Sequence, residues 1–151
     1  MTVNISGANV VFDGGNPRIW TATAKANMSA GTLVRVDGAT GVVTYNPEGF
    51  RPSDLVVAPI ANSKQCNGIT IHDVTSGAKV SIAQRGAWLM RTNAVVSGGD
   101  LVMAVSGTNQ AVKTWGIGSA TVSDINAAPI GRALGNSASG TNLYNLISLN
   151  I

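Results

Sequence analysis

Short runs of alternating apolar and polar residues, separated by glycine-rich turns, recur along the whole chain. The clearest run is C-terminal: positions 143, 145, 147, 149 and 151 share one face, and Asn145 is the one polar residue among them. A period of two predicts a half-buried strand. No window sustains an apolar period of 3.6 residues over three turns. The pattern therefore predicts an all-β chain, folded as a compact β-sandwich or barrel.

The alternation and the turn residues predict the positions of most strands. Prolines and a glycine crowd residues 46–52, which predicts a loop, because proline cannot donate to a central ladder. Asp37-Gly38 and Thr40-Gly41 are typical of hairpin turns and place a return strand over 42–45. The expected strands cover residues 20–24, 33–36, 42–45, 55–58, 69–71, 79–83, 86–91, 101–105, 111–115 and 143–151.

The two halves of the chain repeat each other. The segment 30–36 (AGTLVRV) is echoed by 98–104 (GGDLVMA), an offset of 68 at the glycine (99 minus 31). An Ala-Pro-Ile tripeptide follows in each half, at 58–60 and 128–130, at an offset of 70 (129 minus 59). Each half then closes on a glycine and a strand-like run, 77–83 and 140–146, at an offset of 63 (140 minus 77). We expect one β-unit used twice, with glycines that serve tight turns before strands.

Composition favours a protein covered by partners. The 151 residues suit one domain. Only 11% of them are charged, whereas about 25% is usual in soluble domains. A weakly charged exposed surface promotes association. We expect an extended N-terminal arm over 1–20 and a single β domain over 21–151, with repeat halves of about 22–86 and 87–151.

Charge and hydropathy argue against two kinds of partner. The net charge is +3 and the ten basic residues are scattered, whereas nucleic-acid binders usually gather them on one face. No apolar run approaches the roughly 20 residues of a membrane span. The N-terminus lacks the basic and apolar regions of a signal peptide. We expect neither nucleic acid nor membrane as a partner, and a chain that is made in a cytoplasm and is soluble there.

Candidate catalytic and metal-binding residues are sparse. His72 is the single histidine and Cys66 the single cysteine, so no intrachain disulfide forms and the ligands for a metal site are too few. If His72 and Asp73 lie on a strand, they face opposite sides and form no dyad. The carboxylates are single along the chain, and neither a nucleophile elbow nor a phosphate loop occurs. We expect no catalytic residue, no metal, no cofactor and no enzyme activity.

Several elements keep two interpretations open. Residues 1–18 form either the first strand of the sheet or an arm that adds a strand to a neighbour's sheet. Trp20, Trp88 and Trp115 lie on predicted strands and anchor the core, with a subunit interface as the competing role for Trp115. Arg85 and Arg91 flank the central strand and suit pairs between subunits.

The order of motifs in the second half resembles the small capsid decoration (cement) proteins of tailed phages. The motifs are Gln84-Arg85-Gly86-Ala87-Trp88, Ser97-Gly98-Gly99-Asp100-Leu101-Val102 and Pro129-Ile130-Gly131-Arg132-Ala133-Leu134, followed by an aliphatic C-terminal strand. The first half carries a weaker echo at 30–34 and 58–61. The resemblance covers about residues 22–151. This chain departs from the family in its loop 46–52, its insertion 63–70 and its extended N-terminal segment.

The resemblance implies a β-rich virion protein that binds the outside of an icosahedral capsid as homotrimers and bridges neighbouring major capsid protein subunits. It carries no catalytic residues. On this basis we expect a capsid-contact arm with Val3, Ile5, Val10, Phe12 and Arg18. We expect a subunit interface built from Arg85, Trp88, Arg91 and Trp115.

Two other classes of function remain open from the sequence. The first is a carbohydrate- or receptor-binding β-module of a phage fibre or tail, which needs an exposed aromatic platform in a chain with 5% aromatic residues. The second is an enzyme of the compact β-clip kind, which needs polar residues that converge at a subunit junction. Glycan binding tests the first, and substitution of His72 and Asp73 tests the second.

Overall fold

The computed structural model describes residues 9–12, 18–39, 55–62, 65–105, 110–116, 128–137 and 143–151. Within these ranges the chain forms eleven strands and no helix, which confirms the predicted all-β class. The strands are β1 (Asn9–Phe12), β2 (Ile19–Ala24), β3 (Leu33–Ala39), β4 (Leu55–Pro59), β5 (Gly68–Thr70), β6 (Lys79–Ala83), β7 (Arg85–Thr92), β8 (Leu101–Ala104), β9 (Ala111–Thr114), β10 (Gly131–Ala133) and β11 (Leu143–Asn150).

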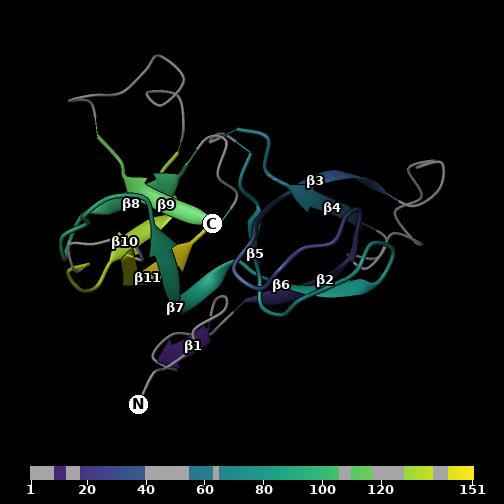
Figure 1. The fold of residues 1–151 in the computed structure, drawn as a ribbon, viewed down its shortest axis with the longest axis horizontal. Helices are drawn as coiled ribbons and strands as arrows, with labels where there is room; N and C mark the ends of the chain where they lie inside the picture. The colour runs from purple at the N-terminus through teal and green to yellow at the C-terminus, as the bar shows by residue number, and fades with distance from the viewer. Residues whose placement is uncertain are drawn as a thin grey trace.

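The strands close into two five-stranded barrels that lie side by side (Figure 1). The first barrel has the order β2-β4-β3-β5-β6 and closes where β6 pairs with β2. The second has the order β7-β11-β10-β8-β9 and closes where β9 pairs with β7. Closure pairs the two strands that would otherwise be the edges of each five-stranded sheet.

The two barrels have the same topology. In each, the first and third strands pair in parallel, β2 with β4 and β7 with β9, and the other pairs are antiparallel. Leu33 and Leu101 begin equivalent strands at an offset of 68 (101 minus 33). Gly31 and Gly99 precede them with φ of 81° and 92°, a backbone region in which glycine has no steric penalty. The predicted repeat and the turn role of its glycines are therefore confirmed for this segment.

The later parts of the repeat align differently from the prediction. Pro59 lies in β4, whereas Pro129 precedes β10, so the two Ala-Pro-Ile tripeptides are not equivalent. Gly68 pairs with Val34 and Gly131 with Val102, which gives β5 and β10 an offset of 63 (131 minus 68). The connections between strands differ in length between the halves, and a sequence comparison without pairing cannot place these length changes.

The closing strands also align at another offset than expected. Thr70 pairs with Ile82 in the first barrel, and Ala133 pairs with Ile147 in the second. These pairs give β6 and β11 an offset of 65 (147 minus 82) instead of 63. Gly140, on which the expected offset rested, lies outside the described residues.

The hairpin turn predicted at Asp37-Gly38 is wrong. Strand β3 continues to Ala39, and its register against β4 shifts between Val36 and Gly38. A bulge of this kind uses the same glycine-containing dipeptide as a turn. Lys25 and Arg35 form ion pairs with Asp37 at this point. The predicted return strand 42–45 lies outside the described residues.

A shared apolar cluster joins the barrels. It contains Leu33 and Ile69 of the first barrel together with Trp88 and Ile147 of the second. A smaller cluster, which includes Val34, Val57, Val80 and Ile82, fills the first barrel alone. Several kcal/mol of apolar burial at residues such as these hold the two units in contact.

Strand β11 shows the predicted alternation. Asn145, Ile147 and Leu149 are buried, and the residues between them are partly exposed. Asn145, the polar interruption, donates from Nδ2 to Val96 O at 3.1 Å and to Gly135 O at 2.7 Å. Its amide group thereby satisfies two carbonyl oxygens inside the second barrel.

Candidate functional site

The N-terminal candidates fall partly on a strand of the chain's own sheet. Strand β1 pairs antiparallel with β7, with Val10 opposite Trp88 and Phe12 opposite Ala87. Residues 9–12 therefore follow the first of the two interpretations, a strand of the sheet. Val3 and Ile5 lie outside the described residues, and Arg18 is exposed just before β2.

Trp88 is a core residue of its own chain. Its side chain is 1% exposed and belongs to the cluster shared by the two barrels. Its Nε1 donates to Arg85 O at 3.1 Å, as expected for a buried indole. Trp88 is therefore removed from the predicted subunit interface, because no part of its side chain is available to a second copy in this fold.

The remaining interface candidates lie at separate places. Arg85 and Arg91 are exposed at the two ends of β7, opposite Asn150 and Tyr144 of β11. The rise over the six residue steps from 85 to 91 in an extended strand separates them by about 20 Å. Trp115 is half-buried just after β9, and its backbone N–H donates to Leu101 O at 2.7 Å. The structure leaves these three side chains on the outside of the second barrel without gathering them into one cluster.

His72 lies in a bend after β5 and Asp73 follows it outside any strand, so the opposite-face argument for strand neighbours does not apply to this pair. His72 Nε2 accepts the N–H of Ser81 at 3.2 Å, and its Nδ1 lies 2.9 Å from Asp73 O. The Asp73 carboxylate accepts the N–H of Ala30 at 2.8 Å. Both side chains thus accept backbone N–H groups, His72 from Ser81 in β6 and Asp73 from Ala30 in a turn, an ordinary structural role.

Cys66 packs against the shared core. Its Sγ lies 3.6 Å from Gly68 O. Burial raises the pKa of the Cys66 thiol from 9.0 to about 11, and the contact with Gly68 opposes that shift. A thiol with a raised pKa is a poor nucleophile.

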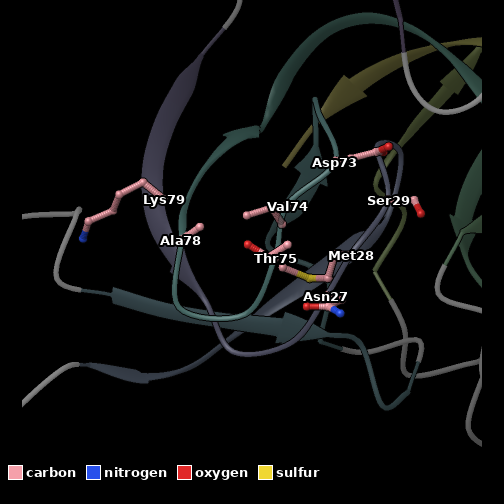
Figure 2. Close-up of a pocket in the computed structure, with 8 residues that line it drawn as sticks. All are labelled: Asn27, Met28, Ser29, Asp73, Val74, Thr75, Ala78 and Lys79. Atoms are coloured by element: carbon pink, nitrogen blue, oxygen red, sulfur yellow. The ribbon is translucent and has the colours of Figure 1, made fainter.

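A groove of about 480 Å³ opens at one end of the first barrel (Figure 2). Met28 and Val74 form its floor and are buried, and Lys79 points away from them in Figure 2. The Lys79 ammonium donates to Thr23 Oγ1 at 2.8 Å. The lining residues are Asn27, Met28, Ser29, Asp73, Val74, Thr75, Ala78 and Lys79.

The polar groups of this groove are engaged in its own turns. Asn27 Oδ1 accepts the N–H of Ser76 at 2.9 Å, and Asp73 is held by Ala30. Among the residues that the structure describes, no three His, Cys, Asp or Glu side chains gather as metal ligands. The groove offers a shape but no set of convergent polar groups for a cofactor.

A second hollow of about 380 Å³ lies on the outside of the second barrel. Leu134, which is 52% exposed, and Arg132 contribute an apolar and a cationic group to it. Arg132 donates to Gly99 O across the turn before β8. The described part of the chain contains no helix, and so no helix that could span a membrane.

Sequence reasoning missed one relation between aromatic residues. Trp20 and Trp88 occupy equivalent positions of β2 and β7, at the repeat offset of 68 (88 minus 20). Trp88 is buried and its indole nitrogen is bonded. Trp20 is half-buried, and its Nε1 finds no acceptor among the described residues. The common offset of 68 residues is a signal in the sequence that could have identified Trp20 and Trp88 as equivalent positions.

Comparison with known proteins gives a likeness of fold. The chain is similar to the crystal structure of the head fibre gp8.5 N base of bacteriophage phi29, with a TM-score of 0.53 and 16% sequence identity. The alignment covers 90% of this chain and 98% of that one. No family model matches the sequence, and no curated protein matches it either. At this identity the likeness establishes the fold of the chain.

Proposed function

We propose that this chain is a structural protein of a tailed-phage virion that decorates the outer surface of the icosahedral capsid. The observation that carries the proposal is the double-barrel fold, which matches a phage head fibre base along nearly the whole of both chains. The order of motifs in the second half points to the same kind of particle by an independent route. Neither argument depends on a ligand site.

The proposed mechanism is mechanical. Each copy bridges neighbouring major capsid protein subunits, and copies associate as homotrimers. A standard protein interface buries about 1,600 Å² in total, so many copies add a large contact area across capsomer boundaries. Two barrels joined by one apolar cluster form a stiff bridge, and no cofactor or catalytic step takes part.

The proposed contact residues form two groups. Val3, Ile5, Val10, Phe12 and Arg18 remain the proposed capsid-contact residues, with Val10 and Phe12 on β1, which pairs with β7 of the same chain, and not on a detached arm. Exposed Arg85 and Arg91, together with half-buried Trp115, are the proposed subunit contacts. Trp88 is no longer part of this set.

The decisive experiment combines sedimentation with reconstitution on shells. Purified protein is expected to sediment as a trimer and to add to undecorated, expanded capsids, as measured by the amount that co-sediments with the shells. A monomer that does not co-sediment with the shells would contradict the proposal. Removal of residues 1–8 should lower occupancy without unfolding the barrels; unchanged occupancy would reject the arm.

A second candidate is the capsid-proximal base of a head fibre, which carries a receptor- or carbohydrate-binding part outward. The description of the similar structure as a head fibre base favours it. Immunogold labelling of virions separates the two proposals, because decoration gives even coverage and fibres give a few discrete points. Binding on a glycan array would add support for the fibre candidate.

A further inference from the structure

One end of the second barrel carries polar residues where the first barrel carries apolar ones. In the first barrel this end opens as the groove, with Met28 and Val74 as its floor (Figure 2). Four buried residues of one cluster form the apolar surface there: Ala24, Met28, Val74 and Val80. If the two barrels were packed alike, the equivalent residues of the second barrel would be apolar too.

The repeat offsets identify those equivalent residues. The offset is 68 for β2 and β7, 63 for β5 and β10, and 65 for β6 and β11. The equivalents are Thr92, Val96, Ser137 and Asn145 (92 minus 24, 96 minus 28, 137 minus 74 and 145 minus 80). All four are buried, and three of them are polar.

Hydrogen bonds support the alignment of the two middle pairs. In the first barrel, the Met28 N–H donates to Val74 O at 2.9 Å, and the Val74 N–H donates to Met28 O at 2.8 Å. In the second barrel, the Ser137 N–H donates to Val96 O at 2.9 Å, and the Val96 N–H donates to Ser137 Oγ at 2.7 Å. The serine hydroxyl thus takes the place of one backbone acceptor and has a partner of its own.

Thr92 and Asn145 differ from Ser137, because each carries a buried polar atom without a partner. Both residues are 3% exposed, and Thr92 Oγ1 and Asn145 Oδ1 bond to none of the described residues. The Asn145 amide is fixed in orientation, since its Nδ2 donates to Val96 O and Gly135 O and an oxygen in that place would face two acceptors. An unpaired buried polar atom is costly.

The two unpaired atoms belong to one inner face of the second barrel. Thr92 lies opposite Leu143 in the pairing of β7 with β11, and Asn145 lies two residues further along β11. Thr92 and Asn145 are therefore diagonal neighbours, which lie about 7 Å apart. Because they make no direct bond to each other, a bridging molecule suits the gap. A Cβ built on Gly135 would lie 3.5 Å from Asn145 Oδ1, so the glycine leaves space beside this oxygen.

We propose that the second barrel binds one structural water molecule between Thr92 and Asn145. The water donates one hydrogen bond to Asn145 Oδ1, and a second bond joins it to Thr92 Oγ1, a hydroxyl that both donates and accepts. Buried waters in proteins serve such otherwise unsatisfied groups. The side chains of Ala24 and Val80 in the first barrel offer no polar atom for an equivalent water. This site does not depend on the proposed virion function.

A crystal structure of the full chain, at a resolution that shows ordered water, tests the site directly. We expect one water whose oxygen lies about 2.5–3.0 Å from both Thr92 Oγ1 and Asn145 Oδ1. The space between Ala24 and Val80 is the internal control and should hold no water. A direct bond between the two side chains, a site without water, or a water that reaches only one of them would overturn the proposal.

Thr92→Val distinguishes a bridged hydroxyl from an unpaired one. Valine has nearly the shape of threonine, so loss of an unpaired hydroxyl leaves stability unchanged or raises it, whereas loss of a bridged one removes a hydrogen bond. We expect the equilibrium constant of unfolding, from urea denaturation, to rise about fivefold. Thr21→Val, the same change at an exposed strand position, should alter it less than about twofold. An unchanged or smaller constant for Thr92→Val would overturn the proposal.

Oxygen-17 relaxation dispersion counts long-lived internal waters in solution. The wild type should hold one more such water than Thr92→Val, and Thr21→Val should match the wild type. Equal counts in the wild type and Thr92→Val would reject the bridge. If the Thr92→Val protein does not fold, the crystal structure of the wild type decides the question.

Discussion

Cys66 is the residue whose chemistry the fold changes most. Burial raises the pKa of its thiol from 9.0 to about 11, so at pH 8 the thiolate fraction falls about 100-fold. Only the thiolate attacks disulfide reagents. We expect Cys66 to react with such a reagent at pH 8 about 100-fold more slowly in the folded chain than in urea. Equal rates would contradict the burial of the thiol.

The same shift makes stability depend on alkaline pH. Because the folded chain holds the thiol proton more tightly, the contribution of Cys66 is fully present below pH 9 and is lost as the pH rises from 9 to about 11. The loss is on the order of 2 kcal/mol in the free energy of unfolding. Urea unfolding at pH 8 and 10.5 measures it. Cys66→Ala, which cannot titrate, should lack this part of the decline.

Single residues also mark the limit of what the sequence reveals. The sequence leaves Trp88 with two roles, core or interface, because a strand pattern does not say which barrel covers which face. The argument that His72 and Asp73 face opposite sides assumes a strand, yet the chain bends at His72, and the N–H of Ser81 in the next strand donates to the imidazole. Both outcomes depend on contacts between residues distant along the chain, which one sequence does not encode locally.

At the scale of elements, the short strands β5 and β10 depend on glycine. A Cβ on Gly131 would lie 2.4 Å from Ser148 O, and one on Gly68 would lie 2.6 Å from Ala83 O. These are backbone oxygens of the paired strands and cannot move aside. We expect Gly131→Ala and Gly68→Ala each to lower the free energy of unfolding by about 1–3 kcal/mol.

Gly116 provides the matched control for these substitutions. Nothing lies within 4 Å of a Cβ built there, so Gly116→Ala should change stability by less than about 0.5 kcal/mol. Urea denaturation of the three variants gives the comparison. Losses at Gly68 and Gly131 no larger than at Gly116 would mean that the strands can separate to admit a side chain.

The elements themselves were largely predictable, and their pairing was not. Strong alternation located β6, β9 and β11 within a residue or two, because one face of each strand lies in a core. The hairpin turn predicted at Asp37-Gly38 is wrong because a bulge and a hairpin turn use the same residues.

At the scale of the whole molecule, the repeat produces one structural unit and not two independently packed barrels. Leu33 belongs to β3 of the first barrel, yet it is fully buried in the cluster that contains Trp88 and Ile147 of the second. The chain passes from β6 to β7 through the single residue Gln84. The N–H of Ile151 at the C-terminus donates to Gln84 O at 3.0 Å. In the bridge proposed above, load between capsid subunits would pass through this junction.

The shared cluster predicts that the two barrels unfold together. Leu33→Ala should lower the free energy of unfolding by about 2–5 kcal/mol, because it leaves a cavity at the junction. Calorimetry should record one transition, with equal calorimetric and van't Hoff enthalpies. Amide exchange should accelerate by a similar factor in β2–β6 and in β7–β11. Val36→Ala, at a position 38% exposed, is the control and should change little. Two transitions, or faster exchange confined to β2–β6, would mean that each barrel is stable alone and that the junction is a hinge.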